Sequence, residues 1–314
     1  MKRHTFLSTA AASGVLWPHI AGAQASTSLT IGGVAEESIT PALWAAHSGM
    51  FDRAGLSVSV QSQSSGAAIA AGVAGGAYAF GKSSLPSIIT AHAKGLPFVF
   101  VVPGGKYDSR APYVKLVVKA DSPLKTGADL NGKTVAVPAL TDIAAVGAKA
   151  WVDQHGGDST TIKFLEFPFS AVADALVAGR ADCGAMADPG LQSAIDLGKV
   201  RVFANFFDAI ALQFMNTGWF TTADYVTHNR DTVIRFARAM RDATAFVSAH
   251  PDDTVDVLAK FTGVDPSVVL KTKRMSYAPI LAPQFIQPVI DACARYKTIP
   301  ASFDARDLIV TGLT

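Results

Sequence analysis

The chain has 314 residues, of which 49% are hydrophobic and 17% are charged. This length and apolar content suit a globular protein of about two domains, at roughly 150 residues each. The low charged fraction excludes a disordered acidic chain and a coiled coil. With 27 basic and 25 acidic residues, the chain also lacks the positive charge expected of a protein that binds nucleic acid or an anionic membrane.

Residues 1–23 have the organisation of a secretory signal peptide. Lys2 and Arg3 are followed by an apolar stretch over residues 6–16 and by an A-x-A cleavage site at Ala21-Gly22-Ala23. The apolar stretch is too short to span a bilayer. We therefore expect export to the periplasm, by ordinary secretion rather than the twin-arginine route, because His4 replaces the second arginine of that signal.

Strand-like and helix-like segments then alternate, which is typical of an α/β fold with mostly parallel strands. The first set has predicted strands over residues 28–34, 56–61 and 96–102, and helices over 40–49 and 67–72. An extended run over residues 114–120 leads into the second set. Its predicted strands cover residues 134–137, 162–167 and 181–186, and its helices cover 143–155 and 170–178.

The chain is predicted to return to the first set at residues 216–220 and to continue as an amphipathic helix over 231–249. Two crossings between two α/β units would form a hinge. We therefore predict a two-lobed α/β fold, each lobe a mostly parallel sheet flanked by helices. Lobe I would comprise residues 26–118 plus 219–314, and lobe II residues 119–218.

Neither the cysteines nor the histidines indicate a catalytic or metal site. Cys183 lies in a short apolar run and Cys293 in an amphipathic stretch, so we expect two buried thiols rather than a disulfide. The sequence contains no C-x-x-C, H-E-x-x-H or G-x-S-x-G motif. We expect no metal and no cofactor.

Residues 76–83 match the phosphate-loop pattern G-x-x-x-x-G-K-[ST]. We reject that interpretation, because residues 77–80 are predicted to be an apolar strand, whereas a phosphate loop needs free backbone N–H groups between its glycines. The surrounding segment, residues 74–84, aligns without gaps on residues 178–188, which indicates one unit used in each lobe. Lys82 would then follow a parallel strand at its carboxyl end, where open α/β sheets bind ligands.

Two further polar pairs stand at predicted helix starts. Glu36 and Glu37 are adjacent, and neighbours in an extended chain point in opposite directions, so we expect them to stabilise a helix entry rather than share an acid–base site. Thr141 and Asp142 precede an apolar helix and fit an N-cap. If that turn faces a cleft, its free N–H groups can also hold an oxyanion.

Three stretches of the mature chain carry family motifs. They are PALWAAHSGMFDRAGLSV over residues 41–58, DSP at 121–123 with DLNGKTVAV over 129–137, and ALVAGRAD over 175–182 with Asp188-Pro189. Together they resemble the exported solute-binding proteins of ABC importers, in the NMT1/THI5-like group that binds sulfonates, taurine and thiamine precursors. One departure is Tyr78, where the first lobe of the family usually has Asp, so the identity of the ligand is not carried over.

The resemblance implies two lobes that close on a small-molecule ligand by hinge motion, and an ABC permease in the inner membrane as partner. We expect a monomer. From their positions at strand ends and helix starts, we expect ligand contacts from Glu37, Ser38, Ser64, Ser65, Gly66, Lys82, Ser83 and Ser84 in lobe I, from Thr141, Asp142 and Asp188 in lobe II, and from Asn216 at the hinge.

Our first hypothesis is a periplasmic binding protein for a small organic anion, a sulfonate or an aromatic carboxylate, with Lys82 as the counter-charge. The acidic candidates leave room for a ligand with an amine, or for a neutral pyrimidine such as a thiamine precursor. An enzyme on the same fold, a pyrimidine synthase or a desulfinase, is the less favoured alternative, because Cys183 lacks a basic neighbour that would activate it. An extracytoplasmic sensor would use the same cleft.

Overall fold

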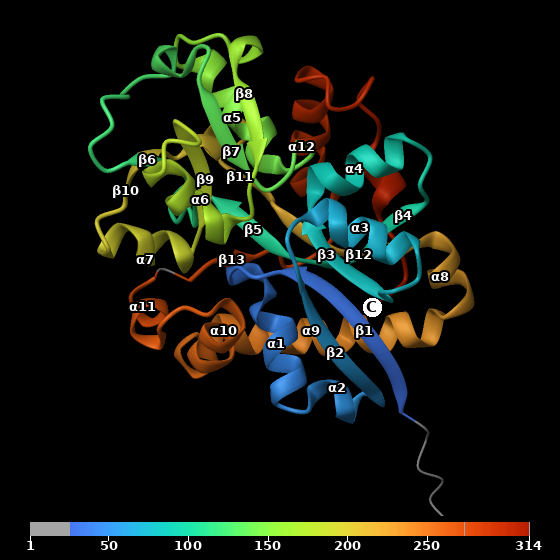
Figure 1. The fold of residues 1–314 in the computed structure, drawn as a ribbon. Helices are drawn as coiled ribbons and strands as arrows, with labels where there is room; N and C mark the ends of the chain where they lie inside the picture. Colours follow the sequence, from blue (N-terminus) through green and yellow to red (C-terminus); the bar gives the residue numbers. More distant parts are fainter. Residues whose placement is uncertain (1–25, 273, 314) are drawn as a thin grey trace, which may run out of the picture.

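The computed structural model describes residues 26–272 and 274–313, so the predicted signal peptide at residues 1–23 lies outside the described residues. Two five-stranded sheets form the centres of two lobes (Figure 1). The first sheet has the order β2-β1-β3-β12-β4, with β1 (Thr27–Val34), β2 (Leu56–Gln63), β3 (Phe80–Ser84), β4 (Phe98–Pro103) and β12 (Thr217–Thr222). The second has the order β10-β6-β9-β7-β8, with β6 (Val114–Lys119), β7 (Thr134–Val137), β8 (Lys163–Glu166), β9 (Cys183–Ala187) and β10 (Val200–Ala204).

Parallel pairing joins β1 to β2 and β3 in the first sheet, and β7 to β8 and β9 in the second. The strands next to the crossings, β12 and β6, are inserted antiparallel to their neighbours. The predicted two-lobed α/β fold is therefore confirmed, with mixed sheets. Because β6 pairs in the second sheet, residues 114–118 lie with the strands of the second lobe.

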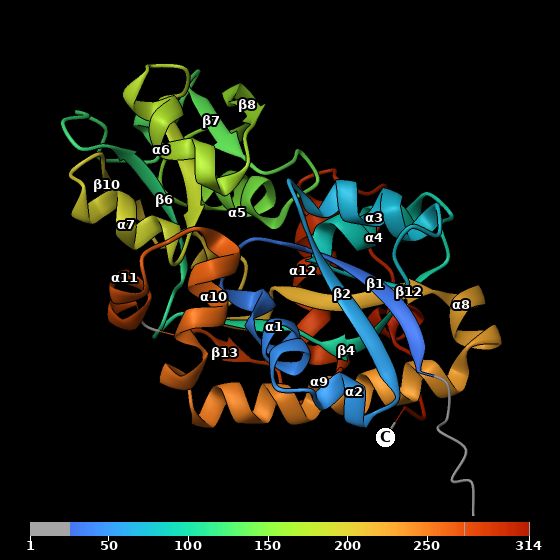
Figure 2. The same cartoon turned by 60° about the horizontal axis from the view of Figure 1, so that its bottom comes forward.

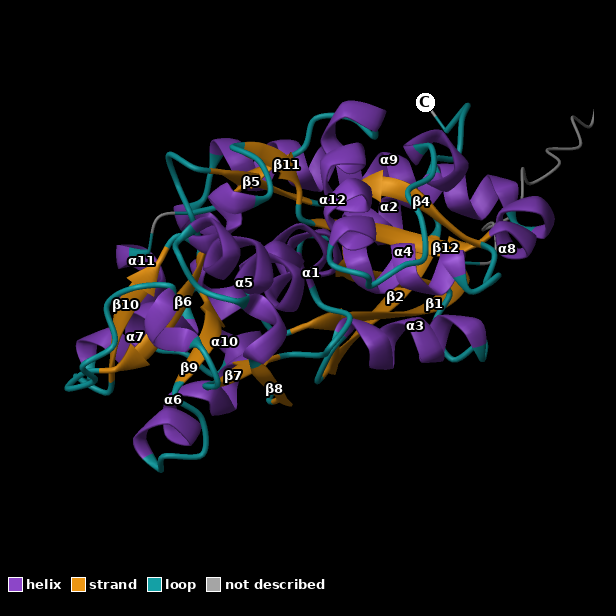
Figure 3. Ribbon diagram, turned by 90° about the horizontal axis from the view of Figure 1, so that it is seen from above, coloured by secondary structure: helices purple, strands orange, loops and turns teal. Residues whose placement is uncertain are grey.

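A third, three-stranded sheet joins the two lobes. Its order is β11-β5-β13, with β5 (Gly105–Asp108), β11 (Gln213–Met215) and β13 (Ser276–Tyr277), all antiparallel. β5 belongs to the outgoing crossing and β11 to the returning one, and they run side by side (Figure 3). The two crossings are therefore hydrogen-bonded to each other. They lie earlier in the chain than predicted, because the segments expected at residues 114–120 and 216–220 are the sheet strands β6 and β12.

Helices cover both sheets. In the first lobe, α1 (Thr40–His47), α2 (Met50–Arg53) and α9 (Arg230–Ala249) lie on one face and α3 (Gly66–Ala74) and α4 (Leu85–Ala93) on the other (Figure 2). The C-terminal part of the chain adds four more helices, α8 (Ala223–His228), α10 (Val255–Thr262), α11 (Pro266–Lys271) and α12 (Pro283–Arg295). The second lobe has α5 (Ile143–Gln154), α6 (Phe169–Val177) and α7 (Gly190–Asp196). No helix among the described residues is both long and apolar enough to cross a membrane.

The apolar stripe of α9 explains its position. Val233, Phe236 and Met240 are fully buried, and the Phe236 ring stacks on Phe80 of β3 at 4.0 Å between centroids. Burial of such side chains stabilises the folded state by roughly 1.5–3 kcal/mol each. The predicted helix over residues 231–249 is confirmed.

The segment with the phosphate-loop pattern differs from its prediction. Strand β3 begins only at Phe80 and continues to Ser84, so the strand predicted over residues 77–80 was placed too early. Lys82 and Ser83 face Trp219 and Gly218 of β12 in antiparallel register, so this part of the pattern is strand rather than loop. Strand β9 lies in the segment that aligns with residues 74–84 and takes the same place in its own sheet as β3 does. Each of these two strands lies between one parallel and one antiparallel neighbour.

Candidate functional site

A pocket lies between the two lobes and contains about 410 Å³ of empty space, including its opening to solvent. Its wall combines residues from the first lobe, both crossings and the second lobe. They are Val34, Glu36, Gly66, Lys82, Ser83, Ser84 and Thr217 in the first lobe, Tyr113 and Asn216 in the crossings, and Val114, Asp142, Ile143, Phe169 and Phe207 in the second lobe. A pocket built in this way changes shape when the lobes move relative to each other.

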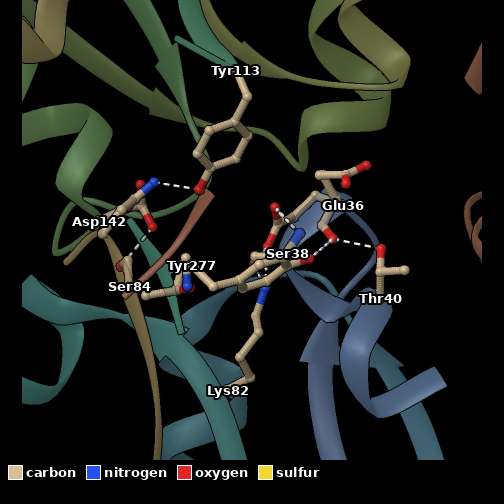
Figure 4. A network of polar contacts seen from close by, with 12 residues as sticks. Glu36, Ser38, Thr40, Lys82, Ser84, Tyr113, Asp142 and Tyr277 are labelled. Atoms are coloured by element: carbon tan, nitrogen blue, oxygen red, sulfur yellow. Dashed lines mark hydrogen bonds and ion pairs between the residues drawn. The ribbon is translucent and has the colours of Figure 1, made fainter. Parts of the chain in front are cut away.

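Lys82 points from β3 toward the segment that follows β1 (Figure 4). Its ammonium donates hydrogen bonds to the Glu36 carboxylate and to the Ser38 hydroxyl. Glu36 also accepts a hydrogen bond from the Ser38 backbone N–H at 3.0 Å, which caps the short helix η1 (Glu37–Ile39). Because the Lys82 side chain is 1% exposed, this ion pair is buried, and Glu36 balances the lysine charge within the protein.

The start of α3 faces the hydroxyl of Ser83. Ser65 caps this helix by accepting from the Ala68 N–H at 3.3 Å, and Gly66 is its first residue. A Cβ atom at Gly66 would lie 2.1 Å from Ser83 Oγ, so only glycine leaves this space open. The Ser83 hydroxyl is buried and has no hydrogen-bond partner among the described residues. Since the first N–H groups of a helix also lack intrahelical partners, this corner offers donors to a ligand.

Ser84 and Asp142 connect the two lobes. The Ser84 hydroxyl donates to Asp142 Oδ2 at 2.8 Å, and the Ala144 N–H donates to Asp142 Oδ1 at 2.9 Å, so Asp142 is the predicted N-cap of α5. Burial raises the pKa of the Asp142 carboxyl. A second contact between the lobes is made by the Ser87 hydroxyl, which donates to the backbone carbonyl of Thr141 at 3.4 Å.

Asn216 and Tyr113 connect the two crossings. The Asn216 side-chain N–H donates to the Tyr113 hydroxyl, while Asn216 Oδ1 is buried without a partner among the described residues. Burial raises the pKa of Tyr113 well above its ordinary value, so the phenol keeps its proton and can donate it. These two side chains therefore offer the pocket one acceptor and one donor.

Glu37 and Asp188 meet beside the pocket rather than in its wall. The Glu37 backbone N–H donates to the Asp188 carbonyl at 3.2 Å. The Glu37 carboxylate is paired with Arg274 at 2.6 Å, and its second oxygen has no partner among the described residues. Burial raises the pKa of Glu37 to about 7 and that of Asp188 to about 6. As predicted, Glu36 and Glu37 do not share a site, since each has a different basic partner.

Half of the residues proposed from the sequence line the pocket. These six of the twelve are Gly66, Lys82, Ser83, Ser84, Asp142 and Asn216. Ser38 contacts Lys82, Ser65 caps α3, Thr141 offers its carbonyl to Ser87, and Ser64 is exposed.

The sequence interpretation missed eight wall residues: Val34, Glu36, Tyr113, Val114, Ile143, Phe169, Phe207 and Thr217. Glu36 and Tyr113 had a usable signal, because the first follows a strand end and the second precedes an extended run. The apolar residues had none, since buried core positions have the same composition.

Cys183 and Cys293 are free and buried, as predicted, and burial raises the pKa of each thiol to about 12. Within residues 26–272 and 274–313, no group of three His, Cys, Asp or Glu side chains could hold a metal ion.

Comparison with solved structures identifies the architecture. The alkanesulfonate-binding protein SsuA from Xanthomonas axonopodis pv. citri, bound to MOPS, has a TM-score of 0.77 at 19% identity, over 90% of this chain and 98% of that protein. The nitrate-binding protein NrtA from Synechocystis PCC 6803 has a TM-score of 0.75 at 13% identity, over 89% and 84%. A DszB mutant in complex with biphenyl-2-sulfinic acid has a TM-score of 0.66 at 14% identity, over 92% and 97%. The fold is thus that of the two-lobed periplasmic binding proteins.

The family follows from the sequence. The model of the family described as NMT1/THI5 like matches residues 36–254, which is more than half of the chain. The chain therefore belongs to the NMT1/THI5-like family, as its motifs indicated. A comparison with curated proteins found no match.

Proposed function

We propose that this protein is the periplasmic solute-binding component of an ABC importer, which delivers a small organic anion to a permease in the inner membrane. The observation that carries the proposal is a pocket between two lobes in which Ser83 Oγ is buried without a partner at the start of α3. The proposed molecule is a monomer whose lobes follow the bounds expected from the sequence, 26–118 plus 219–314 and 119–218, except that β6 pairs in the second sheet from residue 114 and β12 pairs in the first sheet from residue 217. The role involves no nucleic acid and no cofactor.

The start of α3 is the proposed place for the acidic group of the ligand. Helix N-termini favour negative charge by about 0.3–1 kcal/mol, and a hydrogen bond to a charged group contributes about 1.5–3 kcal/mol. Micromolar affinity needs about 8 kcal/mol in total. The apolar wall residues Phe169, Phe207 and Ile143 would supply the rest by burying the carbon skeleton of the ligand.

Lys82 has an indirect role in this proposal. Because its charge is balanced by Glu36, it does not act as an isolated counter-ion, but it keeps the Glu36 carboxylate from repelling an acidic ligand. The structural relatives named for alkanesulfonate and nitrate binding support an anionic ligand. The sulfonate and aromatic carboxylate classes fit the combination of polar corner and apolar wall.

A thermal-shift screen of sulfonates, benzoate-type acids, amino-sulfonates and pyrimidines tests the proposal. A ligand present at about a hundred times its Kd stabilises the folded protein by about 2.7 kcal/mol, which raises Tm measurably. We expect an acid to give the largest shift. Stabilisation by neutral pyrimidines alone would contradict the anion class.

An enzymatic role on the same fold is the second candidate, because DszB has this architecture. The buried Cys183 thiol, with a pKa of about 12, opposes a cysteine nucleophile. The variant Cys183→Ser should bind the ligand with unchanged affinity, and neither protein should consume it. Turnover by the unmodified protein that is lost in Cys183→Ser would overturn the carrier role.

A further inference from the structure

The N-termini of two helices meet across the pocket. Ser84 precedes α4 in the first lobe and Asp142 precedes α5 in the second. The Ser84 side chain does not cap its own helix; its hydroxyl donates instead to Asp142 Oδ2 at 2.8 Å (Figure 4). The Asp142 carboxylate therefore lies where two helix starts converge.

This carboxylate takes the position that an anionic ligand would otherwise use. Helix N-termini attract negative charge, and here the protein supplies that charge itself. Asp142 is only 7% exposed, and both hydrogen bonds that it receives within the described residues come from uncharged donors, the Ser84 hydroxyl and the Ala144 N–H. An acidic group placed beside it would be repelled, whereas a cationic group would be attracted.

A second acceptor faces the same pocket. Asn216 Oδ1 is buried and without a partner in the described part of the chain. An unpaired buried carbonyl oxygen costs free energy unless a donor reaches it. The Asp142 carboxylate and Asn216 Oδ1 are thus two acceptors at this end, beside the Tyr113 hydroxyl as a donor, whereas the start of α3 and Ser83 offer donors.

We propose that Asp142 is a specificity-determining residue that selects ligands carrying an amine at the α5 end of the pocket. With the acidic group at the start of α3, the ligand class becomes an amino-substituted organic acid, either a sulfonate or an aromatic carboxylate. This inference rests on the proposed function, since it assigns the second end of the same ligand. It also limits the proposed function, because a simple acid leaves Asn216 Oδ1 without a donor and places no cationic group beside the Asp142 carboxylate.

Matched ligand pairs that differ only in the amine test the inference by calorimetry on the mature protein. Suitable pairs are taurine with ethanesulfonate, aminobenzoate with benzoate, and an aminopyrimidine with its unsubstituted pyrimidine. We expect the amine-bearing acid to bind at least about tenfold more tightly than its partner. This comparison needs no variant, so it remains decisive even if a substitution impairs folding.

The variant Asp142→Asn keeps an N-cap and an acceptor for Ser84 but removes the charge. It should reduce the preference for the amine to near unity. The matched control is Asp265→Asn, because Asp265 caps α11 through the same two-residue spacing, at 2.8 Å from the Ser267 N–H, but is exposed. The control should leave the preference unchanged.

Each outcome has a distinct meaning. Acids that bind without an amine preference, or with a preference that survives in Asp142→Asn, overturn the role of Asp142 and leave the proposed function intact. A preference for the aminopyrimidine alone, lost in Asp142→Asn, supports the role of Asp142 and overturns the anion class. Binding of none of the six compounds counts against both.

Discussion

The variant Gly66→Ala separates binding from stability. Gly66 is the first residue of α3, and a methyl group there would lie 2.1 Å from Ser83 Oγ, 3.0 Å from Ser87 Oγ and 3.3 Å from Ser83 Cβ. The close atom is a serine hydroxyl, which can rotate away. The methyl group would then fill the corner proposed for the acidic group of the ligand and displace its hydroxyl donor.

The two expected effects differ in size. Alanine is favoured over glycine in a helix by up to about 1 kcal/mol, but shifting the buried Ser83 and Ser87 side chains opposes this gain, so the free energy of unfolding should change by less than about 1 kcal/mol. Loss of the Ser83 hydrogen bond to a charged group should cost about 1.5–3 kcal/mol of binding free energy. That corresponds to an affinity about 10- to 150-fold weaker.

Urea denaturation and calorimetry with the best acid from the screen measure the two quantities. Gly190→Ala is the matched control, because Gly190 is also the first residue of a helix and has nothing within 4 Å of an added Cβ. It should change neither quantity by much. Unchanged affinity of Gly66→Ala for the acid would refute the assignment of this corner as the ligand site.

Three further results are expected. Lys82→Met should lower the free energy of unfolding by about 3–5 kcal/mol in urea, because it leaves a buried Glu36 carboxylate unpaired, and adding Glu36→Met should recover most of the loss. Since burial raises the pKa of Glu37 from 4.5 to about 7, the folded protein holds a proton that the unfolded chain has lost. The contribution of protonated Glu37 to the free energy of unfolding is complete below pH 4.5 and disappears as pH rises through about 7. Glu37→Gln should remove up to about 3 kcal/mol of this pH dependence. Ser84→Ala should shift the ligand-free protein toward open conformations, seen as a larger radius of gyration in X-ray scattering, and an unchanged radius would count against its bridging role.

The elements predicted from the sequence occur in the predicted order, because hydrophobic periodicity and helix caps act locally, whereas no residue ranges were predicted for α4, α7, α8, α10, α11 and α12. Asp142 was expected as an N-cap and is one, and the helix over residues 231–249 matches α9 closely. The start of β3 was misplaced because residues 77–79 are as apolar as a strand. Their place before the strand is fixed by the pairing of β3 with β1 and β12, which is not a local property.

The site was predicted less completely, since a pocket wall depends on which elements converge. Polar residues at strand ends were predicted from their position in the sequence, whereas Glu36 was not predicted as the partner of Lys82. Glu36 was seen next to Glu37, but no local pattern indicates which of the two carboxylates turns toward a residue 46 positions away. For the same reason, the meeting of Ser84 with Asp142 could not be foreseen.

The three-stranded sheet between the lobes restricts how they can move. β5 is hydrogen-bonded on one edge to β11 and on the other to β13, so the two connecting segments neither slide past each other nor twist separately. We therefore expect the proposed opening to be a rotation about essentially one axis, with bending at the residues where these strands end. A solute would consequently enter and leave along a single path, and backbone amides of β5 would stay protected from hydrogen exchange throughout the cycle.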